Sequence, residues 1–161
     1  MSAPPLAFPA HIPFVEALGI ELWALEHGTA ELRLKLAPEH LNTWQVAHGG
    51  VSMTLLDVAM AMAARSGHSA GLDGSPGVAT IEMKTSFTRP GEGTLRATGR
   101  LLHRSISLAF CEGSVFDDED RLCAHATGTF KYLKALPTRG RQLNPLNPTK
   151  PAVAGEGDTP S

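Results

Sequence analysis

Alternating hydrophobic and polar residues predict strands along much of the chain. Within residues 29–36, Leu32, Leu34 and Leu36 alternate with charged residues, which is typical of a half-buried strand with one wet face. Similar patterns predict strands at residues 20–26, 78–88, 94–103, 107–116 and 122–133. The links between these segments are short, whereas parallel pairing needs a crossover of about a dozen residues or more, so we expect antiparallel pairing.

One segment differs because it has neither alternation nor a polar face. From Gly49 to about Arg65 the sequence is GGVSMTLLDVAMAMAAR, with small or apolar side chains at nearly every position. This pattern predicts a helix that is buried nearly all round. A second, short helical turn is predicted at residues 12–18, ending at Gly19. One long buried helix and about six strands predict an α+β fold, in which a single sheet wraps around the central helix.

The regular patterns fade at both ends of the chain. Residues 1–11 carry few signals, and residues 137–161 contain five prolines and three glycines among polar residues. We therefore expect a flexible N-terminal segment at 1–11, one folded domain at 12–136, and a flexible Pro/Gly-rich tail at 137–161.

Charge and composition exclude several classes of protein. There are 14 basic and 16 acidic residues, a net charge of −2, which argues against a nucleic-acid binder. The longest apolar run, 51–64, is shorter than the roughly 20 residues of a membrane helix, and residues 1–13 do not resemble a secretory signal. Cys111 and Cys123 lack metal-binding spacing and are predicted to be reduced. We expect a cytoplasmic protein that binds no membrane and no metal.

Asp57 is the first candidate for chemistry, because it is the only ionisable residue between His48 and Arg65. Burying a carboxylate costs several kcal/mol unless the group is paired or protonated. Two interpretations follow. Asp57 is either a structural carboxylate bonded to a neighbouring strand or loop, or a catalytic base or nucleophile in a partly dry cleft.

The sequence His48-Gly49-Gly50 opens the predicted helix. Glycines at a helix start allow another molecule to approach the backbone, where free N–H groups point outward at the positive end of the helix dipole. That arrangement suits a developing oxyanion, although the same glycines also suit a tight turn. The other histidines lack metal-ligand spacing and are predicted to be surface or strand residues: His11, His27, His40, His68, His103 and His125.

The spacing between these two candidates has a consequence for assembly. Gly49 and Asp57 are eight residues apart, which is about 12 Å along a helix axis. An oxyanion donor and a base or nucleophile that act on one carbonyl must lie much closer together. If both residues act, two antiparallel copies of the helix must meet, which predicts a homodimer.

Five features in order carry a resemblance to a known family. They are Asn42, HGG at 48–50, Leu56-Asp57, FTRP at 87–90, and ATGTF at 126–130. This order resembles the hotdog-fold acyl-CoA thioesterases, and within them the phenylacetate-pathway (PaaI-like) branch, over about residues 12–134. The resemblance implies a hotdog fold and an acyl-CoA substrate such as phenylacetyl-CoA. No metal or redox cofactor is expected, since the sequence has neither metal-ligand spacing nor a GxGxxG motif. Because proteins of this family commonly form tetramers, the resemblance further implies a homotetramer.

The resemblance also implies roles for individual residues. Asp57 matches the general base or nucleophile, and Gly49 matches the glycine whose N–H polarises the thioester carbonyl, with His48 close by. Asn42 matches a residue that holds the water or the leaving sulfur. Thr80 matches a Ser or Thr that supports the carboxylate.

Three arginines are candidates for binding the CoA phosphates, and each could equally be an ordinary solvated charge on a strand: Arg89, Arg100 and Arg104. Two other functions remain open. One is an acyl-CoA hydratase or dehydratase on the same fold, and the other is a non-catalytic module that binds or senses acyl-CoA.

Overall fold

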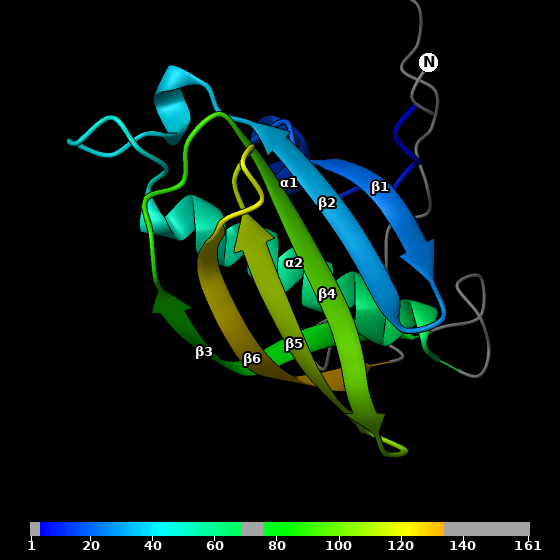
Figure 1. Cartoon of the computed structure of the whole chain (residues 1–161). Helices are drawn as coiled ribbons and strands as arrows, with labels where there is room; N and C mark the ends of the chain where they lie inside the picture. The colour runs from blue at the N-terminus through cyan, green and yellow to red at the C-terminus, as the bar shows by residue number, and fades with distance from the viewer. Residues whose placement is uncertain (1–3, 69–75, 134–161) are drawn as a thin grey trace, which may run out of the picture.

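Six strands form one antiparallel sheet that curves around a single long helix, α2 (Figure 1). The computed structural model describes residues 4–68 and 76–133. The helices are α1 (Pro13–Ala17), the 3-10 helix η1 (Pro38–His40) and α2 (Gly49–Ser66). The strands are β1 (Glu21–Glu26), β2 (Thr29–Lys35), β3 (Gly77–Phe87), β4 (Thr94–Arg104), β5 (Leu108–Phe116) and β6 (Leu122–Leu133).

The order of strands across the sheet is β1-β2-β4-β5-β6-β3, and every neighbouring pair is antiparallel. The prediction of an α+β fold, with an antiparallel sheet around a central helix, is therefore confirmed. The 3-10 helix η1 was not predicted. Of the helices in the described part of the chain, none combines the length and apolarity needed to cross a lipid bilayer.

The sheet approaches the helix backbone closely at Gly99 in β4. A Cβ atom at this position would lie only 2.2 Å from the carbonyl oxygen of Ala59 in α2. Glycine is therefore required, because any side chain would push the strand away from the helix. The apolar residues of α2 around this point, including Leu55, Leu56 and Met60, are fully buried.

Not all of α2 is covered by the sheet, which differs from the sequence prediction. Gly50, Met53, Thr54, Asp57 and Ala61 stay partly or fully exposed along one side of the helix. These positions recur at intervals of three or four residues, so they form one continuous stripe. We refer to these five residues as the open stripe of α2. Asp57 therefore lies at the solvent-accessible side of a helix that is otherwise buried.

The two edges of the sheet differ. At the β1 edge, the backbone N–H of Leu6 donates to the carbonyl oxygen of Leu22 at 2.7 Å, so the N-terminal segment adds a bridge to β1. At the other edge, β3 pairs with β6, and no other segment of the described chain pairs with it. An unpaired edge of 11 residues is a template for pairing with another chain.

The predicted terminal segments are only partly described. Residues 4–11, within the segment predicted to be flexible, contact the domain through Leu6, and Ala10 is buried. The predicted tail at 137–161 lies outside the described residues. The domain boundaries and the flexibility of both ends remain predictions.

A β-bulge in β3 decides which side chains face the helix. The pairing with β6 shifts between Thr80 and Glu82, so that Thr80 pairs with Phe130 and Met83 pairs with Gly128. Strict alternation back from Met83 would turn Thr80 to the outer face. Because the bulge inserts Ile81, Thr80 instead shares the helix-facing side with Met83.

The close contact at Gly99 generates a prediction about stability. We expect Gly99→Ala to lower the free energy of unfolding by about 2 kcal/mol or more, because the added methyl group overpacks β4 against the backbone of α2. Chemical denaturation measures the change. Thr98→Ala, on the outer face of the same strand, is the matched control. Equal stability of both variants would show that β4 does not approach α2 so closely.

Candidate active site

Asp57 lies on α2 opposite β3 and is held there by one strong hydrogen bond. The hydroxyl of Thr80 donates to Oδ1 of Asp57 at 2.6 Å. The bulge in β3 makes this contact possible, since it turns Thr80 toward the helix. The other carboxylate oxygen, Oδ2, has no hydrogen-bond partner among the described residues. The hydrogen bond holds the carboxylate through Oδ1 and leaves Oδ2 free to interact with another molecule.

The N-terminus of α2 leaves one backbone donor free. Nδ1 of His48 accepts from the N–H of Gly50 at 3.0 Å, so His48 caps the helix. The carbonyl oxygen of His48 accepts from Val51 and Ser52 at 2.9 and 3.3 Å. The N–H of Gly49 has no hydrogen-bond partner within the described residues. It therefore points outward at the positive end of the helix dipole, where a developing negative charge is stabilised.

Asn42 begins a tight loop that leads into this helix. Its Oδ1 accepts from the N–H of Trp44 at 2.8 Å and from the N–H of Val46 at 3.4 Å. A bridge between Leu41 and Ala47 closes the loop. The carboxamide oxygen of Asn42 thus shapes the loop, whereas its Nδ2 group has no partner in the described part of the chain and is free to donate to another molecule.

Phe87, the last residue of β3, packs beside Gly49. A Cβ atom at Gly49 would lie 3.4 Å from Cζ of Phe87, which is ordinary van der Waals contact. Phe87 remains 54% exposed, so its ring forms an apolar wall next to the free N–H. Sequence reasoning noted Phe87 only as part of a motif and did not place its ring over the glycine.

The predicted residues thus form two groups in one chain. Asp57 and Thr80 make one group in the middle of α2, and Asn42, His48 and Gly49 make the other at its N-terminus. The helical rise separates the groups by about 12 Å along the axis. One chain therefore does not bring the carboxylate and the Gly49 N–H onto a single carbonyl carbon.

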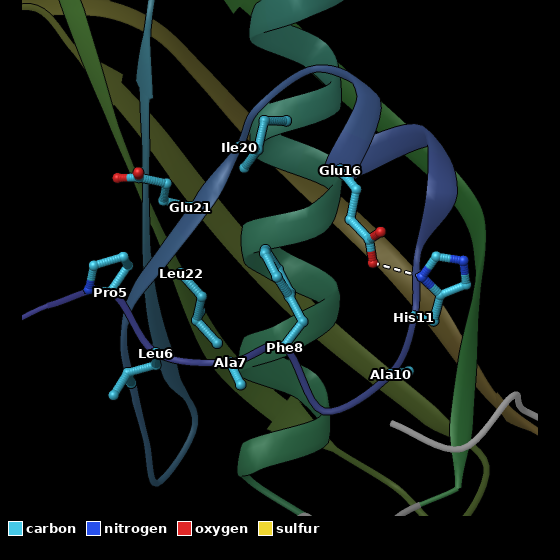
Figure 2. Close-up of a pocket in the computed structure, with 10 residues that line it drawn as sticks. All are labelled: Pro5, Leu6, Ala7, Phe8, Ala10, His11, Glu16, Ile20, Glu21 and Leu22. Carbon is cyan, nitrogen blue, oxygen red and sulfur yellow. Dashed lines mark hydrogen bonds and ion pairs between the residues drawn. The ribbon is translucent and has the colours of Figure 1, made fainter. Parts of the chain in front are cut away.

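A pocket elsewhere on the chain belongs to neither group. Figure 2 shows this pocket, of about 400 Å³, between the N-terminal segment, α1 and β1. It is lined mainly by apolar side chains such as Phe8 and Leu22, with the hydrogen bond between His11 and Glu16, at 2.7 Å, on one side. Because neither Asp57 nor Gly49 lines it, this pocket does not serve the candidate site.

The three candidate arginines have different surroundings. Arg100 forms an ion pair with Glu112 of β5, in which its Nε lies 3.0 Å from Oε1. Arg104 lies in register with Ala109 and near Tyr132. Burial raises the pKa of Tyr132, and the positive charge of Arg104 offsets part of that rise. Because the Tyr132 hydroxyl donates to the carbonyl of Ala64, this region is the C-terminal end of α2.

Arg89 lies at the other end of the site, two residues after Phe87. It is exposed and donates to the carbonyl oxygen of Leu122 at 3.3 Å. Arg89 is therefore near the Gly49 end of α2 and keeps a guanidinium without a carboxylate partner among the described residues.

Other possible reactive groups are less suited to catalysis. Cys111 and Cys123 are both free and buried, and burial raises the pKa of Cys111 to about 12, so that it stays a thiol. Ser114 and His125 are hydrogen-bonded at 3.0 Å on the outer face of the sheet, with no carboxylate partner for His125 in the described chain. Within residues 4–68 and 76–133, no cluster of His, Cys, Asp or Glu has a metal-binding arrangement.

One histidine prediction is wrong. His40 is not a surface or strand residue but lies in η1 and is only 4% exposed. Its Nδ1 accepts from the N–H of Ala37 at 3.0 Å, and its carbonyl accepts from the N–H of His48 at 2.8 Å. His40 thus anchors the start of α2, a role that spacing alone does not reveal.

Comparison with known proteins decides the family. Residues 45–124 match the sequence profile of the Thioesterase superfamily. The chain is 30% identical over 135 residues to the medium/long-chain acyl-CoA thioesterase YigI of Escherichia coli K12, covering 76% of this chain and 87% of YigI. This chain belongs to the thioesterase superfamily. It is therefore a thioester hydrolase.

Two further similarities support this family. The chain is 34% identical over 111 residues to the acyl-coenzyme A thioesterase PaaI of E. coli K12, covering 68% of this chain and 74% of PaaI. A solved structure, conserved protein PA5202 of Pseudomonas aeruginosa, matches with a TM-score of 0.71 and 32% identity, covering 78% of this chain and 97% of that protein. The hotdog fold expected from the sequence is thus confirmed.

The Thr80–Asp57 hydrogen bond generates a prediction about positioning. We expect Thr80→Val to reduce kcat by about 10-fold or more, because a hydrogen bond to a charged group contributes roughly 1.5–3 kcal/mol. Thr80→Ser keeps the hydroxyl and should retain most of the turnover. Steady-state kinetics on acyl-CoA measures both variants, and melting curves check folding. A Ser variant as impaired as the Val variant would contradict a positioning role for the hydroxyl.

Proposed function

We propose that this protein hydrolyses an acyl-CoA to the free acid and CoA, at a site shared between two copies of the chain. One observation carries the proposal: Asp57 is held by Thr80 with its second oxygen open, while the free N–H of Gly49 lies at the far end of the same helical segment. In a dimer with antiparallel helices, the Gly49 N–H of one protomer meets the partner's Asp57.

Two exposed features favour such a dimer. The outer edge of β3 is unpaired in the described chain, and the open stripe of α2 faces the same side of the molecule as Thr80. Pairing of β3 with the partner's β3 would extend the sheet across a two-fold axis and bring the two helices together. Association of two such dimers into a tetramer is a further proposal, which rests on the resemblance alone.

The first step is attack on the thioester carbonyl carbon. In the general-base route, Oδ2 of Asp57 takes a proton from a water molecule as the water oxygen forms its bond to carbon. The carbonyl electrons move to oxygen, and the partner protomer's Gly49 N–H stabilises the negative charge. The bond to sulfur then breaks, and the proton passes to the leaving thiolate.

In the alternative nucleophilic route, Oδ2 itself attacks and expels the CoA thiolate, which leaves a mixed anhydride that water then hydrolyses. Both routes use the same residues. In either, the free Nδ2 group of Asn42 is placed to donate to the water or to the leaving sulfur, and His48 holds the helix terminus by capping it.

Arg89 is the arginine that we propose for the CoA phosphates. It follows Phe87, which contacts Gly49, and it has no carboxylate partner among the described residues. Arg100 is already neutralised by Glu112, and Arg104 lies toward the other end of α2.

The acyl group is proposed from two relatives whose names differ. YigI is named for medium and long acyl chains, whereas PaaI is named as an acyl-coenzyme A thioesterase without a stated chain length. We propose a medium, long or aromatic acyl group, with phenylacetyl as the aromatic candidate. Thiol release from a panel of acyl-CoAs tests this, and it also separates a hydrolase from a hydratase or a binding module.

The central prediction concerns Asp57. We expect Asp57→Asn to reduce thiol release on the order of 100-fold or more, because the variant lacks a proton acceptor or nucleophile. The amide is nearly isosteric and can still accept from Thr80, so folding should be retained. Glu82→Gln, an acidic residue on the outer face of β3, is the control. Near-normal turnover of Asp57→Asn would make Asp57 a structural carboxylate.

A mixing experiment tests the shared site directly. Asp57→Asn and Gly49→Val should each be nearly inactive as homodimers, since one lacks the carboxylate and valine at 49 covers the N–H. After subunit exchange, activity should recover toward about a quarter of wild type, because half the dimers are mixed and each has one intact site of two.

The structure requires a control for this mixture. Valine at position 49 would crowd Phe87, so a melting curve of Gly49→Val must show a folded protein. If exchange is confirmed by mass spectrometry and the variant is folded, but no activity returns, the site lies within one chain.

A further inference from the structure

The most exposed large aromatic side chain in the described structure is Trp44. Its exposed fraction is 83%, compared with 63% for Phe14 and 54% for Phe87. An indole buries a large apolar area when it is covered, and tryptophan is enriched at the centres of binding interfaces. Its exposure in a single chain therefore calls for a covering surface.

The loop that carries Trp44 is tightly structured. The Leu41–Ala47 bridge closes its base, the N–H of Asn42 donates to Val46 at 2.9 Å, and Oδ1 of Asn42 accepts from Trp44 itself. Gln45 adopts a left-handed conformation, with φ of 61°. A loop this constrained presents the indole in a fixed direction, so little conformational freedom is lost when it binds.

The loop is also fixed relative to the Gly49 N–H. The N–H of Ala47 donates to Gly91 at 2.9 Å, and that of His48 donates to His40 at 2.8 Å. Trp44 is three residues from Ala47, so its backbone lies within about 10 Å of it. Figure 1 shows this cyan loop projecting away from the sheet beside the N-terminal end of α2.

We propose that Trp44 of each protomer reaches the partner and forms a wall of the acyl pocket in the shared site. This inference rests on the proposed function: if the Gly49 N–H meets the partner's Asp57, the loop that precedes Gly49 lies at the same junction. Trp44 then contacts the acyl chain of the thioester held there, and it determines which acyl groups are accepted.

The charge of the surrounding segment favours the acyl group over the adenine of CoA. Residues 38–48 contain no lysine or arginine and include Glu39. A site for the adenine end of CoA must accommodate nearby phosphates, which require cations. The proposed phosphate-binding residue, Arg89, belongs to the segment whose Gly91 bonds Ala47 at the base of the loop, and not to the tip that carries Trp44.

Kinetics on a series of acyl-CoAs tests the role of the indole. For Trp44→Ala we expect kcat/KM to fall about 10-fold or more for the preferred medium, long or aromatic substrate, and little for acetyl-CoA, since lost apolar contacts scale with the acyl group. Trp44→Phe should restore much of the loss. Ile106→Ala, which removes a fully exposed side chain between β4 and β5, is the matched control and should leave all rates unchanged.

Fluorescence gives a second measurement that does not depend on turnover. The chain has two tryptophans, so Trp23→Phe leaves Trp44 as the single reporter. The guanidinium carbon of Arg33 lies 4.1 Å from the ring centroid of Trp23, and Trp23 is not part of the site. We expect the Trp44 emission to be that of a covered indole in the assembled protein, to shift to the red on dilution to monomers, and to change when a non-hydrolysable acyl-CoA thioether binds.

Several results would overturn the proposal, and they differ from failure of the proposed function. An equal loss for all substrates, including acetyl-CoA, with weaker inhibition by free CoA would place the indole against adenine. Loss of the dimer in Trp44→Ala without a change in acyl preference would make Trp44 an interface anchor only. Unchanged kinetics would assign it no role. In contrast, if the wild-type protein releases no thiol from any acyl-CoA, the proposed function itself is wrong.

Discussion

The structure depends on one constraint: a carboxylate must sit on an apolar helix without being buried alone. Asp57 meets this constraint in two ways. Thr80 donates a hydrogen bond to one of its oxygens, and the open stripe of α2 leaves the side chain partly accessible. A hydrogen-bonded, partly solvated carboxylate avoids most of the cost of burial and remains reactive. The bulge in β3 serves this arrangement, because without it Thr80 would face away from the helix.

The same constraint explains why one side of the domain has an uncovered helix stripe and an unpaired strand edge. The sheet covers most of α2 and approaches its backbone directly at Gly99, but it leaves the stripe that carries Asp57 uncovered. The β1 edge is extended by the N-terminal segment through Leu6, whereas the β3 edge is open in the described chain. The open stripe and the open edge lie next to each other, since Thr80 of β3 contacts Asp57 of α2. A second copy of the chain is the partner that would complete both at once.

The sequence predicted the fold closely because each element carries a strong local pattern. The alternation of Leu32 and Leu34 with charged residues predicts β2. The lack of a polar face predicts α2, and the predicted ends of this helix agree with the observed ends to within one residue. The uncovered stripe was not predicted, since the sequence of an apolar helix gives no local sign of which side the sheet leaves uncovered. The bulge at Ile81 was not predicted either. It has no local signal, because it depends on pairing with β6, some 50 residues away.

The candidate site could be predicted in part for the same physical reason. Asp57 and Gly49 stand out because their chemistry differs from that of the apolar residues around them, and the resemblance added Thr80, Asn42 and His48. The structure then shows the contact of Thr80 with Asp57 and the capping by His48. Phe87 and Trp44 were not singled out, because an aromatic side chain in a sequence gives no sign of whether its ring lies over a glycine or in solvent. His40 was misassigned, since its burial arises from the 3-10 turn that anchors α2.

In the proposed shared site, the two groups lie at two positions on one helix, which would separate catalysis from selectivity. Asp57 and Thr80 are held together between α2 and β3, so under the proposed function changes there would affect the rate for every substrate. The loop from Leu41 to Ala47 is closed by its own bridge and by the side chain of Asn42, so its tip can vary without disturbing that packing. Residues at the tip would then set the acyl preference of the partner's site, while the base and the Gly49 N–H stay the same. On this reasoning, relatives that share the two proposed catalytic groups should differ in substrate mainly through this loop.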